Sequence, residues 1–114
     1  MTTNNRSERV AAEIERLNNV FKDIPEDKKH VVEGLIVQAA RLRIMLDDAW
    51  QDIDENGDYE QFQQSPSVPA YDRERPIAKL FNARDKAYQT IMKQLADFLP
   101  NTNLETVIKP RKLL

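Results

Sequence analysis

The longest uninterrupted pattern in the chain runs from residue 25 to about residue 56 and predicts one helix. At a rise of about 1.5 Å per residue this helix is roughly 48 Å long, more than a compact domain of this size needs. Pro25 suits a first helical turn, and Asp23 stands at capping-box spacing from Glu26. Asn56 and Gly57 favour the left-handed conformation that ends a helix. The rest of the chain is therefore expected to pack against this helix.

An apolar seam runs along this helix at alternating steps of three and four residues, which is typical of helix-on-helix packing. Its members are Val32, Leu35, Ala39, Leu42, Leu46, Ala49 and Ile53. The other elements also read as helical, because only 2 glycines occur in 114 residues and 32% of the residues are charged. We therefore predict an all-α fold, with the long central helix in an antiparallel helical hairpin and a shorter N-terminal helix beside it.

The predicted boundaries divide residues 1–100 into one helical domain, followed by a basic tail at 101–114. Helices are expected at about 6–21, 25–56 and 76–99. The connection between the first two is short, so the first helix must fold back antiparallel and cover half of the second. Residues 57–75 contain Pro66 and Pro69 and show no helical or alternating period, so they are predicted to be a linker.

The central helix is apolar on more than its seam, which predicts that something covers a second face. Val37 and Ile44 point almost opposite to the seam, and the end near Trp50 lacks a third layer of the chain's own helices. We expect other subunits to cover these positions, through helix faces that include Val37, Arg41, Ile44, Trp50, Ile53 and Ile77. The alternative is that the linker folds back, with Phe62 or Tyr71 as plugs.

Few residues suit catalysis or metal binding, so we predict no catalytic residue, metal or cofactor. The chain has no cysteine, and its one histidine, His30, lies near no glycine-rich nucleophile turn. Residues 52–63 resemble an EF-hand loop, but the twelfth position is Gln63 where a bidentate glutamate is needed. The acidic end of the central helix should instead attract a cation, with Arg73 and Arg75 or a neighbouring subunit as the sources.

Basic residues gather in the second half of the chain. Residues 1–60 hold 8 Lys+Arg and 14 Asp+Glu, or −6, whereas residues 61–114 hold 9 and 5, or +4. This asymmetry suits association between subunits or nucleic-acid binding. The candidate phosphate-binding residues are three in the tail and three on one face of the last helix. They are Lys109, Arg111 and Lys112, then Lys79, Lys86 and Lys93.

No signal peptide is indicated by the first residues, and no stretch approaches the roughly 20 apolar residues of a membrane span. We therefore expect a soluble protein without a membrane partner.

The order of segments resembles the small terminase subunits of tailed phages and prophages of Gram-positive bacteria. The resemblance covers about residues 21–100 and rests on the phrases KDIPEDKK, VEGLI and the ending QLADFLP. It implies a non-enzymatic DNA-packaging component that forms a homo-oligomeric ring, binds double-stranded viral DNA and delivers it to the large terminase subunit. The cytoplasm of the infected bacterial host would be its location. The chain departs from the family pattern in its longer proline-containing linker and its short basic tail.

Two functions from different classes follow as hypotheses. The first is the DNA-packaging small subunit. The second is a helical protein-interaction adaptor or regulator whose acidic pole docks a basic partner without DNA binding.

Overall fold

The computed structural model describes residues 5–99, and these form three helices and one small hairpin. The helices are α1 (Asn5–Val20), α2 (Lys29–Asn56) and α3 (Pro76–Ala96), with a 3-10 turn, η1 (Glu26–Lys28), before α2. The strands β1 (Tyr59–Phe62) and β2 (Tyr71–Glu74) pair antiparallel between α2 and α3. The prediction of a mainly helical protein is confirmed, and the predicted tail at 101–114 lies outside the described residues.

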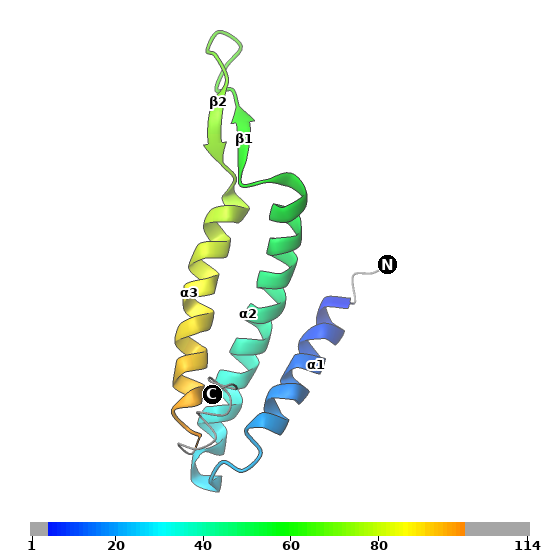
Figure 1. Cartoon of the computed structure of the whole chain (residues 1–114), viewed down its shortest axis with the longest axis vertical. Coiled ribbons are helices and arrows are strands. Elements are labelled where there is room, and N and C mark those ends of the chain that lie inside the picture. The colour runs from blue at the N-terminus through cyan, green and yellow to red at the C-terminus, as the bar shows by residue number, and fades with distance from the viewer. Residues whose placement is uncertain (1–4, 100–114) are drawn as a thin grey trace, which may run out of the picture.

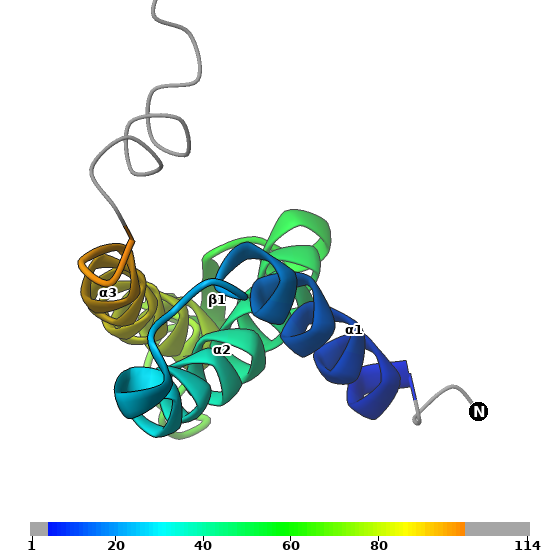
Figure 2. The same cartoon turned by 90° about the horizontal axis from the view of Figure 1, so that it is seen from below.

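Helix α2 lies between α1 and α3 and contacts both of them (Figure 1). Every member of its predicted seam, Val32 to Ile53, is buried or half-buried. Seen from the end, α1 crosses α2 at an angle and diverges from it toward the N-terminus, while α3 lies on the other side (Figure 2). The seam therefore sets the packing of the described chain.

The core is densest where α1 turns into α2. Leu17 and Phe21 of the first helix and its turn pack there with Ile36 of α2 and with Leu95 of α3. The central helix begins later than expected, at Lys29, because residues 26–28 form the 3-10 turn. The expected cap by Asp23 is absent there, since Pro25 precedes the turn without a side-chain cap. Its other end is as predicted: Gly57 has φ +86° and donates its N–H to the Ile53 carbonyl at 2.7 Å.

The expectation of an unstructured linker over residues 57–75 is wrong, because a β-hairpin forms there and projects beyond the ends of α2 and α3 (Figure 1). Side chains pair across the two strands. Arg73 of β2 binds Glu60 of β1 and lies 3.7 Å over the Phe62 ring, and Phe62 meets Tyr71 edge-on with ring centroids 5.8 Å apart. Cross-strand pairs of this kind stabilise so short a ladder. Because Phe62 packs against Tyr71 of the partner strand, the hairpin does not fold back over the end of α2 near Trp50.

Candidate interaction surfaces

A small pocket lies at the base of the hairpin, where α2 ends and α3 begins. Its volume is about 150 Å³. Trp50 of α2 and Phe81 of α3 form one wall, with ring centroids 6.1 Å apart and planes tilted by 45°. The residues that line it are Trp50, Ile53, Asp58, Glu74, Ala78, Phe81 and Asn82. We call this the hairpin pocket.

Trp50 is the largest apolar side chain at this pocket, and it is 56% exposed. An exposed tryptophan beside a hollow, rimmed by polar residues, is the usual form of a protein contact site. Two further exposed aromatic residues, Tyr59 and Tyr71, belong to the hairpin. This end of the molecule therefore exposes three aromatic side chains, which makes it a candidate contact surface.

The pocket has a fixed geometry because Arg75 ties its edges together. The Arg75 guanidinium donates to Asp52 Oδ1 at 2.8 Å and to the Gly57 carbonyl at 2.7 Å, and the Arg75 amide donates to the Asp58 carbonyl at 2.7 Å. The prediction that Arg75 supplies a cation to the acidic end of α2 is confirmed. The other predicted cation, Arg73, is engaged by Glu60 instead.

The acidic turn does not have the shape of a calcium loop. Residues 52–56 belong to α2 and residues 59–62 to β1, so the oxygen-bearing side chains do not wrap around one point. Hydrogen bonds from Asn56 and from Arg75 hold the pKa of Asp52 below its usual range. Within residues 5–99, no group of three metal-ligating side chains has suitable geometry.

Ion pairs join the N-terminal part of α1 to α2. Arg6 and Arg9 both bind the Asp48 carboxylate, at 2.8 Å and 2.7 Å. Burial favours a higher pKa for Asp48, but the hydrogen bonds from Arg9 and Arg6 outweigh it and the pKa lies below its usual value. Helix α1 thus extends along more of α2 than the half that was predicted.

We expect this carboxylate to make the docking of α1 sensitive to acid. A group whose pKa is lower in the folded state stabilises the fold above its unfolded pKa, and the stabilisation is lost as the pH falls through the folded pKa. Asp48→Asn should therefore lower the free energy of unfolding by about 1 kcal/mol at pH 7. The difference from the unmodified protein should begin to shrink as the pH falls below about 4 and should disappear below the folded-state pKa of Asp48.

Urea unfolding at several pH values measures this difference. Asp54→Asn is the matched control, because Asp54 is exposed on the same helix and has no ion pair among the described residues. A difference that stayed constant down to pH 2 would assign the effect of Asp48 to packing and not to charge.

The residues predicted for a subunit interface divide into two groups. Ile44 and Ile53 are buried within the chain itself, at 6% and 8% exposure, so no other subunit is needed to cover them. Val37 and Ile77 are half-buried, and Arg41 and Trp50 are exposed. The expectation that another subunit covers Ile44 and Ile53 is thus corrected, whereas Trp50 is left exposed by the described residues.

The burial of Ile44 has a simple geometric cause. Ile36, Ala40, Ile44 and Asp48 follow each other at steps of four, and such a row slants across the surface of a helix. The first three are buried and the fourth binds the arginines of α1. The obliquely crossing α1 therefore follows this row (Figure 2).

The three predicted lysines of α3 lie on its outer face. Lys79, Lys86 and Lys93 are all exposed, at steps of seven residues or about two turns. From Lys79 to Gln94 every other exposed residue is uncharged, while Asp85 is half-buried and accepts a hydrogen bond from Gln89. Within the described part of the chain none of the three lysines has an ion pair. The predicted Lys109, Arg111 and Lys112 lie outside that part.

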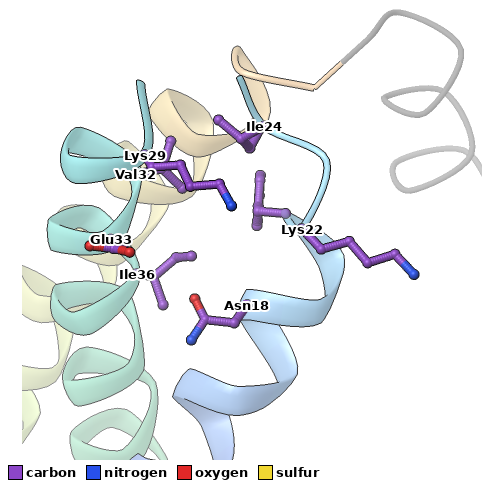
Figure 3. A pocket seen from close by; sticks show the side chains of 8 residues that line it. Asn18, Lys22, Ile24, Lys29, Val32, Glu33 and Ile36 are labelled. Carbon is purple, nitrogen blue, oxygen red and sulfur yellow. The ribbon is translucent and has the colours of Figure 1, made fainter. Parts of the chain in front are cut away.

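A second hollow lies between the end of α1 and the start of α2, with a volume of about 230 Å³. Ile24, Val32 and Ile36 form its apolar floor, and Lys29 extends its amine into it, whereas Lys22 points away (Figure 3). His30, the residue considered for catalysis, is not part of it and is exposed, with Nδ1 3.9 Å from Glu33.

Two features escaped the sequence analysis. The strands are only four residues long, YEQF and YDRE, and their signal is no more than Tyr59, Phe62 and Tyr71 on either side of a Ser-Pro loop. The contact of Arg6 and Arg9 with Asp48 joins residues about 40 positions apart and has no local signal.

No helix within residues 5–99 is long and apolar enough to cross a membrane. Comparison with protein families, with curated proteins and with solved structures gave no match to this chain.

Proposed function

We propose that this protein is a DNA-packaging small subunit, a non-enzymatic oligomer that binds double-stranded viral DNA and presents it to a large terminase subunit. The observation that supports DNA binding best is the outer face of α3. Lysines are the only charged residues exposed on that helix between Lys79 and Gln94. The sequence resemblance supplies the biological setting, in the cytoplasm of an infected bacterial host.

The lysine face fits a phosphate backbone in scale. Lys79 and Lys93 are separated by fourteen residues of helix, or roughly 21 Å, with Lys86 midway. Charged lysines on a straight helix contact phosphates without reading bases. The binding is therefore expected to depend strongly on salt and weakly on sequence, with further cations from Lys109, Arg111 and Lys112.

Assembly is the second part of the proposal. The exposed Trp50 and its pocket provide an apolar contact point at the hairpin end of the described structure. Helix faces that include Val37, Arg41 and Ile77 enlarge this contact surface. In a ring, each DNA-binding face is repeated around one axis, so weak contacts from single subunits combine into stable binding.

The experiment that tests this function is the electrophoretic mobility of double-stranded DNA with added protein at several salt concentrations. We expect a shift at low salt, with an affinity that falls linearly on a logarithmic salt scale. An unchanged mobility at the lowest salt would contradict the proposal.

The alternative is a helical protein-interaction adaptor or regulator. It is favoured by the projecting hairpin, on which Tyr59 is 62% exposed beside acidic residues. An adaptor that docks a basic protein should leave the mobility of DNA unchanged at every salt concentration.

A further inference from the structure

The hairpin pocket combines an apolar wall with an acidic rim. Trp50 and Phe81 form the wall, and Asp58 and Glu74 stand at the edge. Both carboxylates are exposed, and neither has an ion pair among residues 5–99. The two arginines that flank Glu74 in the sequence are already engaged, Arg75 by Asp52 and the Gly57 carbonyl and Arg73 by Glu60. A ligand for this pocket should therefore carry cations next to apolar side chains.

One segment of this chain has that composition. Residues 109–114 read KPRKLL, with three cations followed by two leucines, and they lie outside the described residues. We propose that the hairpin pocket of one copy receives residues 109–114 of a second copy. In this contact Leu113 and Leu114 cover Trp50 and Phe81, and the cations face Asp58 and Glu74.

The segment is assigned to a second copy because the proposed function already places copies beside one another. The pocket lies at the start of α3, and Leu99, the last described residue, lies beyond the opposite end of that helix. From Ala78 to Leu99 the chain travels roughly 32 Å along α3. The fourteen residues from Leu99 to Leu113 span at most about 50 Å when fully extended, so chain length permits contact with either pocket. The native mass distinguishes the two, because a return to the same pocket leaves a monomer, whereas a contact between copies raises the mass.

A contact between two different surfaces is heterologous, so each copy is both donor and acceptor. Such contacts produce a closed ring if the rotation between neighbours closes, and an open filament if it does not. The inference thus rests on the assembly part of the proposed function and specifies one contact that makes it. Because Lys109, Arg111 and Lys112 are also candidate DNA contacts, DNA should compete with the pocket for them.

A charge swap tests the contact with full-length chains. The pocket variant carries Asp58→Lys and Glu74→Lys, and the tail variant carries Lys109→Glu, Arg111→Glu and Lys112→Glu. Each variant alone places like charges together, so its apparent dissociation constant for assembly should rise about tenfold or more. An equimolar mixture restores opposite charges at both kinds of contact and should recover the native mass.

The control for the pocket variant is Glu8→Lys with Glu15→Lys, which changes the net charge equally on the exposed surface of α1. It should assemble normally. Trp50 is the only tryptophan, so its emission reports the contact directly and should shift to the blue on assembly and on mixing. If the pocket variant loses helicity, Asp58→Asn with Glu74→Gln replaces it, with the same expected direction.

Three results would overturn the inference. The first is assembly of either variant at the affinity of the unmodified chain, which would leave the proposed ring intact but place its contacts elsewhere. The second is a mixture that stays dissociated. The third is an unmodified chain that remains monomeric, which would contradict the assembly part of the proposed function as well.

Discussion

Replacing Ile44 with glutamate is expected to unfold the chain, not only to disperse an assembly. Ile44 is 6% exposed on the row of α2 that α1 crosses. Truncation of a buried aliphatic side chain already costs about 2–5 kcal/mol, and a carboxylate without a partner adds several more. A domain of this size has about 5–15 kcal/mol of stability in total. Far-UV circular dichroism and urea unfolding should therefore show a largely unfolded or strongly destabilised protein.

The control for this substitution is Val31→Glu on the same helix, where the side chain is 57% exposed. It should change the free energy of unfolding by less than about 0.5 kcal/mol. A helical, cooperatively unfolding Ile44→Glu variant with a reduced native mass would contradict the single-chain packing. It would support the sequence-based expectation that this face lies between subunits.

The second large effect is expected from the lysine face of α3. Replacing Lys79, Lys86 and Lys93 together with alanine removes three phosphate contacts, so the slope of log affinity against log salt should decrease in magnitude by about 2.7. Affinity at low salt should fall uniformly across DNA sequences, because phosphate contacts carry no base information. Fluorescence anisotropy of labelled duplexes, repeated over a salt series, measures both quantities.

A matched variant removes the same number of charges elsewhere. Lys22, Lys28 and Lys29 belong to the connection between α1 and α2 and to the first residue of α2, and not to α3. Their replacement with alanine should leave the salt slope within about 0.5 of the original. Equal losses in both variants would show that DNA responds to net charge alone and that α3 is not its binding face.

Periodicity predicted the parts of the fold that depend on local pattern. The seam of α2 is buried or half-buried as expected, because an apolar stripe at helical spacing faces the core. Gly57 ends α2 because its positive φ is open to glycine at little cost. These signals lie within a few residues of each other in the sequence.

The corrections concern features set by distant partners. Ile44 was expected to be covered by another subunit, because the crossing angle of α1 cannot be read from the spacing of residues along α2. The hairpin was missed since strands of four residues give almost no period, and its stability comes from cross-strand pairs such as Arg73 with Glu60. Asp58 and Glu74, at the base of the hairpin, then line a pocket whose aromatic wall is formed by Trp50 of α2 and Phe81 of α3.

The candidate contact residues were only partly predictable. Lys79, Lys86 and Lys93 follow from helical spacing, because steps of seven return to the same face. Trp50 was identified as uncovered from its position beside the seam. Asp58 and Glu74 were not, since only the hairpin brings the end of α2 and the start of α3 together around one hollow.

The native mass in solution tests the central claim most directly. One chain has a mass of 13.3 kDa, and an oligomeric DNA-packaging subunit should elute with a light-scattering mass that is a whole multiple of this value at micromolar concentration. The multiple should fall toward one when the ionic contacts are screened by high salt. A stable 13.3 kDa species at low salt and high protein concentration would contradict the account.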